Sequence, residues 1–225
     1  MRIGVLLYRG VDLLDAGGPY EVFLTASRLA ARDGGEPPFE VVTVSPDGAP
    51  VVAYGGLGLT PHVAAPHAGP LDVLVVPGTM DLDGATADAP LLAAIEGLAA
   101  EAGLVTSVCT GSALLGAAGL IGDRPWTTHW EDIDLLAQQL GSSGATREVR
   151  WVDAGDVVTA GGLASGIAMA LHLVDRLAGR TLATRTARQL DYDWDPADPV
   201  VPVVPAVPAV PADSAPDTSA AAAEP

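Results

Sequence analysis

The chain has 225 residues, of which 49% are hydrophobic and only 4% aromatic, enough for one sizeable domain with a core of Ala, Val, Leu and Gly. Its formal net charge is −17, and all 11 basic residues are arginines because the sequence contains no lysine. The missing lysine excludes Schiff-base and P-loop chemistry, and the acidity argues against nucleic acid and anionic membranes as partners.

The N-terminal half alternates apolar strand patterns with one clear helix pattern. Residues 2–8 are apolar at successive positions, which predicts a central strand of a parallel sheet. Residues 10–18 are expected to form a loop, after which Pro19 opens a helix at its first turn. Further along we expect that helix over 20–32, a strand over 39–44, a short hairpin over 50–60 and a buried strand over 71–77.

The C-terminal half continues the alternation of strands and helices. We expect strands over 103–108, 124–128, 148–152 and 156–160, and helices over 90–102, 110–120, 130–140, 163–177 and 182–190. This order predicts an α/β fold, a doubly wound sandwich with a mostly parallel central sheet.

The chain is expected to divide into a folded domain over 1–194 and a tail over 195–225. In the tail, prolines recur at every third position from Pro196 to Pro211, a spacing typical of polyproline II, and the last residues are Ala-rich and acidic. Two long uncharged stretches, 102–122 and 157–174, are interrupted by Gly, Ser and Thr. We interpret them as strand–turn–helix units of a soluble protein and expect no membrane partner.

Cys109 is the only cysteine, and it lies where a predicted strand turns into a helix beside the small residues Gly111 and Ser112. This is the sequence pattern of a nucleophile elbow, in which a sharp turn exposes the side chain above the sheet. The helix N-terminus beneath it is expected to favour a thiolate. A lone cysteine also excludes an internal disulfide and fits a reducing cytoplasm.

Other candidate residues follow the carboxyl ends of predicted strands, where reacting groups collect in open α/β sheets. Asp15 could share a proton with the Cys109 thiol, although it could equally be a loop carboxylate or a helix cap. The backbone N–H groups of Gly78, Thr79 and Thr110 could form an oxyanion hole. A plain strand-to-loop turn at Gly78-Thr79 is the alternative.

The four histidines are weaker candidates. His129 follows Cys109 by twenty residues and could lie in the second shell of the site, but a packing role is the commoner one for such a residue. His62 and His67 lack the acidic and cysteine neighbours of a metal site, so we expect no metal. His172 falls in an apolar helix and is expected in the core.

Five blocks of this sequence resemble the ThiJ/PfpI family, a branch of the class I glutamine-amidotransferase-like superfamily, and are most similar to its isonitrile hydratase subgroup. The blocks are Asp15 to Phe23, Val76 to Gly78, Thr106 to Leu120, Thr127 to Trp130 and Thr159 to Gly162. The resemblance implies a flavodoxin-like sandwich, usually a homodimer, acting on a small-molecule substrate without metal or organic cofactor. It carries Cys109 over as nucleophile, Asp15 as acid/base partner and Thr110 as the residue beside the thiol.

The activity implied by the resemblance is hydration of an isonitrile to an N-substituted formamide through a thioimidate on Cys109. Two departures bear on this: Thr79 stands where the family commonly has a second glycine, and Thr110 stands where peptidase and deglycase branches often have histidine. A cofactor-free glyoxalase or deglycase is the first alternative. A redox or metabolite sensor is the second, because similar domains precede helix-turn-helix regulators.

Overall fold

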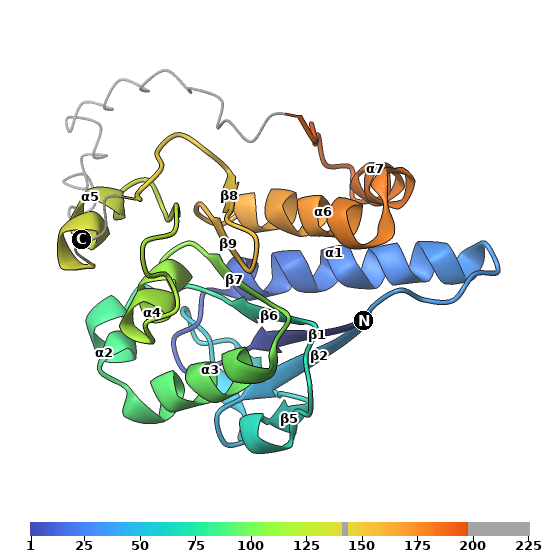
Figure 1. The fold of residues 1–225 in the computed structure, drawn as a ribbon. Helices are drawn as coiled ribbons and strands as arrows, with labels where there is room; N and C mark the ends of the chain where they lie inside the picture. Colours follow the sequence, from blue (N-terminus) through green and yellow to red (C-terminus); the bar gives the residue numbers. More distant parts are fainter. Residues whose placement is uncertain (141–143, 198–225) are drawn as a thin grey trace, which may run out of the picture.

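The computed structural model describes residues 1–140 and 144–197, which form a sheet between two layers of helices (Figure 1). The strands of this seven-stranded sheet, in spatial order, are β5 (Val63–Ala64), β2 (Glu40–Ser45), β1 (Arg2–Leu6), β6 (Val73–Val76), β7 (Leu104–Val108), β9 (Val157–Ala160) and β8 (Trp151–Asp153). All neighbours pair in parallel except β8, which runs antiparallel to β9. The predicted doubly wound, mostly parallel fold is confirmed.

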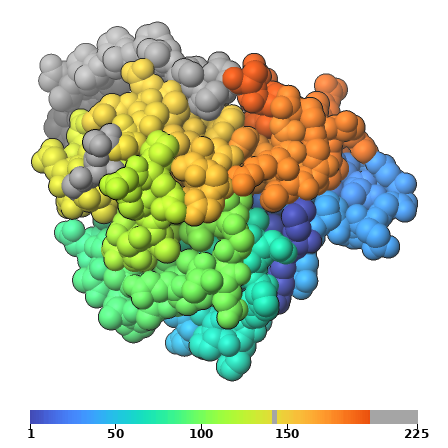
Figure 2. Space-filling view, viewed as in Figure 1, coloured from blue at the N-terminus to red at the C-terminus, as the bar shows by residue number. Residues whose placement is uncertain are grey.

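The helices cover both faces of the sheet. One layer contains α1 (Leu13–Arg32), α6 (Ser165–Ala178) and α7 (Arg180–Gln189), and the other contains α2 (Leu82–Thr86), α3 (Ala89–Glu101) and α4 (Gly111–Ala117). A further helix, α5 (Ile133–Gln139), follows α4 in the chain. Figure 2 shows the light-blue end of α1 standing out from the surface beside the orange α7.

Two short elements lie outside these layers. The predicted hairpin is confirmed, with β3 (Val51–Val52) antiparallel to β4 (Gly58–Leu59) and left-handed glycines at Gly55 and Gly56 in the turn. A single 3₁₀ turn, η1 (Ala65–His67), follows β5. The core is mainly aliphatic, as the composition predicts, because the inner strands β1 and β6 are apolar on both faces.

The start of α1 differs from the prediction. The helix begins at Leu13 rather than Tyr20, Asp12 caps it by accepting a hydrogen bond from the Leu14 N–H (3.0 Å), and Pro19 lies inside it. Proline at that position removes one intrahelical hydrogen bond, and packing of α1 against α6 and α7 compensates for the loss. Asp15 therefore lies on the first turn of a helix rather than in a loop.

Residues 124–128 do not form the predicted strand. Trp126 makes only an isolated bridge to Ala145, and the Thr127 N–H donates to the Oγ1 of Thr159 (2.8 Å) rather than to a strand carbonyl. Pro125 has no N–H to offer a ladder. The predicted tail falls largely outside the described residues, because 198–225 are not among them.

Candidate active site

Cys109 follows β7 in a left-handed backbone conformation, with φ of +56°. Such a conformation costs a non-glycine residue about 1–2 kcal/mol, so the surrounding structure must hold it. Its N–H is shared between the carbonyls of Ala160 (3.1 Å) and Gly161 (3.0 Å). Its carbonyl accepts from the Ser112 N–H (3.4 Å) and the Thr128 Oγ1 (2.9 Å). These bonds on both sides fix the predicted elbow.

Gly111 allows the turn into α4 because its backbone lies against the end of β6. A Cβ at this position would collide with the carbonyl oxygen of Val76 and with the carbonyl group of Pro77. The predicted need for a small residue here is confirmed. The physical reason is close approach of two backbone segments rather than unusual dihedral angles.

Asp15 is fully buried on the first turn of α1, and only one of its oxygens is satisfied. Its Oδ2 accepts from the Gly78 N–H (3.1 Å), whereas its Oδ1 is buried with no hydrogen-bond partner. Burial, followed by repulsion from Asp12, raises the pKa of Asp15 to about 7. The Gly78 N–H, the Cys109 thiol and the Leu163 N–H favour its ionised form and only partly oppose the rise.

The Cys109 thiol is neutral in this environment. Burial raises its pKa to about 12, and the charge of Asp15 contributes to the rise, with smaller effects of Asp132 and Asp12. The Thr110 N–H lowers this pKa, but one donor at the start of a seven-residue helix does not offset burial beside acids. The prediction that the helix N-terminus keeps Cys109 as a thiolate is therefore wrong for the resting protein.

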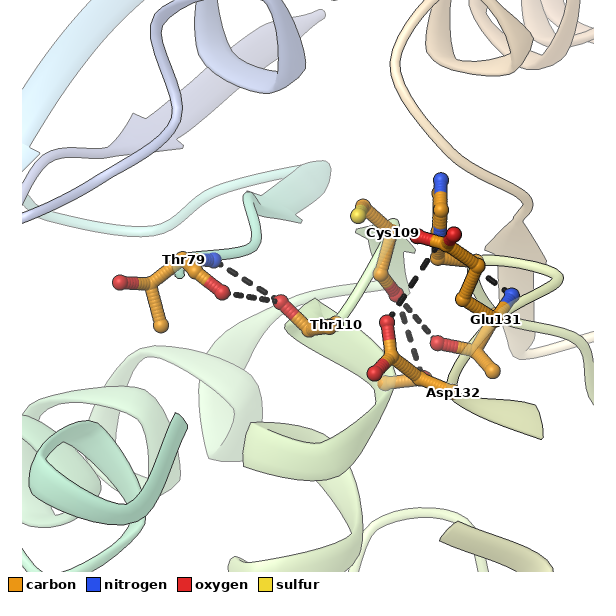
Figure 3. A network of polar contacts seen from close by, with 8 residues as sticks. Thr79, Cys109, Thr110, Glu131 and Asp132 are labelled. Atoms are coloured by element: carbon orange, nitrogen blue, oxygen red, sulfur yellow. Dashed lines mark hydrogen bonds and ion pairs between the residues drawn. The ribbon is translucent and has the colours of Figure 1, made fainter. Parts of the chain in front are cut away.

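The Gly78-Thr79 turn links Asp15 to Thr110. The Thr79 N–H donates to the Thr110 Oγ1, which in turn donates to the Thr79 carbonyl, both at 2.9 Å; Figure 3 shows this pair beside Cys109. A Cβ on Gly78 would lie 2.6 Å from the Thr110 Oγ1 and 2.9 Å from the Asp15 Oδ2. The N–H groups of Gly78 and Thr79, expected as oxyanion donors, thus already have acceptors within the protein and position two side chains of the site.

His129 contacts Glu131 and Asp132, two acidic residues that Figure 3 shows on the side of Cys109 away from Thr79. Its Nδ1 lies 3.5 Å from the Asp132 Oδ2 and 3.8 Å from the Glu131 Oε2, and the Glu131 N–H donates to it (3.4 Å). The ring packs directly against Gly162, where a Cβ would overlap it. Its connection to Cys109 is indirect, through the charge of Asp132, so a second-shell role stays a prediction.

Two further residues of the site, Tyr8 and Leu163, are not among the candidates identified from the sequence. Tyr8 is buried beneath the pair, donates its hydroxyl to the Pro77 carbonyl (2.8 Å), and has a pKa raised by burial and by the charges of Asp15 and Cys109. Leu163 adopts a left-handed conformation (φ +50°) and directs its N–H toward Asp15. A tyrosine at the carboxyl end of the first strand was a usable signal, whereas nothing in the sequence marks Leu163.

Two of the remaining histidines, His62 and His172, have structural partners. His62 shares its Nδ1 with the N–H of Thr43 (2.9 Å). The prediction that His172 lies in the core is wrong: the residue is half-buried, its Nε2 lies 2.7 Å from the Asp153 Oδ2, and its ring stacks on Trp151. Within residues 1–140 and 144–197, no group of three His, Cys, Asp or Glu side chains is arranged to hold a metal ion. Nor does any helix of this part combine the length and apolarity needed to cross a membrane.

The fold and the site together define a class of protein. It is a flavodoxin-like α/β sandwich with a cysteine at an elbow after a central strand and a buried acid on the first helix. Residues 1–176 match the DJ-1/PfpI family. The chain belongs to this family, which confirms the resemblance found in its sequence.

Three known proteins illustrate the relationship. The isonitrile hydratase of Pseudomonas putida is 38% identical over 192 residues, covering 85% of this chain and 78% of the relative. A ThiJ/PfpI family protein from Pseudomonas syringae, of known crystal structure, superposes with a TM-score of 0.75 at 31% identity, covering 87% of this chain and 76% of that one. The HTH-type transcriptional regulator GbdR of Pseudomonas aeruginosa is 26% identical over 191 residues. That alignment covers 85% of this chain and 50% of the regulator.

Proposed function

We propose that this protein is an isonitrile hydratase, which adds water to R–N≡C and releases an N-substituted formamide. The observation that carries the proposal is the pairing of Cys109 with Asp15, a buried carboxyl whose pKa of about 7 lets it accept and return a proton near neutral pH. This choice of substrate is supported by the 38% identity to the isonitrile hydratase of Pseudomonas putida, in an alignment that covers 78% of that enzyme.

The first step joins sulfur to the terminal carbon of the isonitrile. Because the thiol is neutral, ionised Asp15 takes its proton as the S–C bond forms, and then returns the same proton to that carbon. The product is a thioimidate, R–N=CH–S–Cys109, with Asp15 again ionised. The Oδ1 of Asp15, which has no other partner, is the oxygen available for this transfer.

The second step releases the formamide. Asp15 takes a proton from a water molecule as the water oxygen bonds to the thioimidate carbon. Asp15 then passes that proton to the nitrogen, which has received the C=N electron pair, and a tetrahedral intermediate results. The C–S bond then breaks as the carbonyl forms, and the hydroxyl proton returns through Asp15 to sulfur. One water is consumed, and thiol and carboxylate are regenerated.

The alternative in a different class is a sensor domain, and its support is the similarity to the regulator GbdR over most of this chain. A cofactor-free glyoxalase or deglycase would use the same thiol on a 2-oxoaldehyde. Since one fold serves all three roles, only the reaction itself separates them.

The test is a turnover screen of the full chain with methyl, cyclohexyl and benzyl isonitriles and with methylglyoxal, following formamide or lactate by NMR. We expect formamide from the isonitriles, loss of turnover by a factor of about 10⁴ in Cys109→Ala, and a large loss in Asp15→Asn. Asp47→Asn is the matched control, because Asp47 lies in an exposed turn where Asn can keep the bond to the Ala49 N–H. Lactate without formamide would favour the glyoxalase, and selective thiol oxidation without any turnover would favour the sensor.

A further inference from the structure

A pocket of about 560 Å³ lies beside residues that contact the Cys109–Asp15 pair, and the mechanism above does not use it. Two of its lining residues also contact the pair: Thr128 donates to the Cys109 carbonyl, and Leu163 directs its N–H toward Asp15. Thr128 and Leu163 therefore connect the pocket to the pair, although neither Cys109 nor Asp15 is itself a lining residue. The volume of the pocket is within the range of sites that enclose small organic ligands.

Much of the surface that lines this pocket is apolar, and part of it is exposed. Ile133 and Val149 lie along it, and Leu163 at its edge is 40% exposed. Trp130 is the extreme case, since 75% of this large side chain is exposed at the pocket. An exposed indole beside a concave apolar surface is typical of a ligand-binding wall, because a bound apolar group removes both surfaces from water.

The charged residues around the pocket are mostly acidic. Asp134 and Glu148 line it, and Asp132 contacts His129, which also lines it. Among the described lining residues, Arg147 is the single arginine, and it forms an ion pair with Asp134. An anionic ligand would therefore meet carboxylates and an arginine that already has a partner.

We propose that this pocket binds the N-substituent of the isonitrile, with Trp130 and Ile133 packing on an apolar group, and that it selects neutral or cationic substituents over carboxylates. The inference rests on the proposed function and extends it, because it names which side chains choose among substrates. Trp130 and Asp134 are specificity residues in this proposal rather than catalytic ones.

The size preference is tested with benzyl and methyl isonitrile as the two probes. Trp130→Ala is expected to lower the ratio of kcat/KM for benzyl over methyl isonitrile by roughly tenfold, mainly through a higher KM for the benzyl compound. Leu135→Ala is the control, since Leu135 is another large apolar side chain, 50% exposed on α5, that does not line the pocket. Its ratio should equal that of the wild type.

The charge preference is tested with benzyl isonitrile and its para-carboxylate and para-aminomethyl analogues, which differ in charge at similar size. Asp134→Asn removes one carboxylate and frees Arg147, so the carboxylate-to-benzyl ratio of kcat/KM should rise by roughly fivefold. Arg147→Gln should lower the same ratio, and Asp47→Asn should leave it unchanged.

The outcomes separate this inference from the proposed function. Formamide production with ratios unaltered in both Trp130→Ala and Asp134→Asn would refute the pocket assignment alone. Conversion of the protein to a smaller assembly by Trp130→Ala, with the benzyl ratio unaltered, would assign the indole to a subunit interface and also refute it. Absence of formamide from every probe would refute the hydratase and this inference together.

Discussion

Asp15→Asn should make the stability of this protein less sensitive to pH. Asp15 has no exposed surface, and its pKa is about 7 in the folded protein against 3.8 for an ordinary aspartate. Asparagine has nearly the same shape, and its carbonyl can still accept from the Gly78 N–H. The substitution therefore removes the titration of this position with little change in packing.

The sign and size of the effect follow from proton linkage. Between pH 3.8 and about 7, the folded state holds a proton at Asp15 that the unfolded chain has released, so the free energy of unfolding falls as pH rises. Each pH unit costs about 1.4 kcal/mol until the folded carboxyl ionises. From pH 5.5 to 8.5 the wild type should lose about 2 kcal/mol more than Asp15→Asn does.

The assay is chemical unfolding in urea at both pH values for wild type, Asp15→Asn and the exposed control Asp47→Asn. At each pH, the free energy of unfolding of the wild type is subtracted from that of the variant, and the two differences are compared. Other titrating groups and the packing effects of the amide cancel in this comparison. A difference that stays constant between the two pH values would show that Asp15 titrates as an ordinary carboxyl. The proposed role as a proton carrier near neutral pH would then lose its basis.

Three further predictions concern the same site. Asp15→Asn should speed alkylation of Cys109 by iodoacetamide at pH 8.5, because loss of the neighbouring charge lowers a thiol pKa that is now about 12; an unchanged rate would contradict this. Gly78→Ala should lower kcat/KM by roughly a hundredfold, because the new Cβ displaces Thr110 and Asp15. Gly97→Ala in α3 is the control: nothing lies within 4 Å of its new Cβ, so it should keep activity and raise the free energy of unfolding by up to about 1 kcal/mol. In urea unfolding, Cys109→Gly should have a free energy of unfolding about 1 kcal/mol higher than Cys109→Ala, since only glycine relieves the left-handed backbone. The reverse order would argue against strain at the elbow.

The convergence of the site was predictable from the sequence because parallel strands present their carboxyl ends at one edge. Asp15 and Gly78 are 63 positions apart, and Thr79 and Thr110 are 31 apart, yet both pairs are hydrogen-bonded. Each of these residues follows an apolar run whose buried character is readable without coordinates. The adjacency of β1, β6 and β7 in the sheet then brings them together.

The beginning of α1 was not predictable from local preference. Gly17, Gly18 and Pro19 are typical of a loop followed by a helix start, but the helix runs through them. The reason is tertiary: a Cβ on Gly18 would lie 3.0 Å from the Ile167 side chain on α6, so the glycine permits close packing of two helices. A pattern limited to neighbouring residues does not contain that contact.

The ionisation states were also beyond the sequence, because they depend on a balance between opposing effects. The helix N-terminus at Thr110 does favour a thiolate, as expected, but burial and the Asp15 charge outweigh it. The same burial raises the pKa of Asp15, which is why the two groups cannot both be charged at low cost. Which effect wins is decided by the depth of the site, and depth is a property of the fold.

The site combines several energetically costly features in one place. Cys109 is held in a left-handed conformation, the Oδ1 of Asp15 is buried without a partner, and both groups have pKa values shifted toward their neutral forms. A carboxamide at position 15 would remove the buried ionisable group, and a glycine at position 109 would relieve the left-handed backbone. Features that lower stability and are nevertheless maintained by a network of hydrogen bonds are expected where they serve a reaction. In the proposed mechanism, these costs support the exchange of one proton between the neutral thiol and the buried carboxylate.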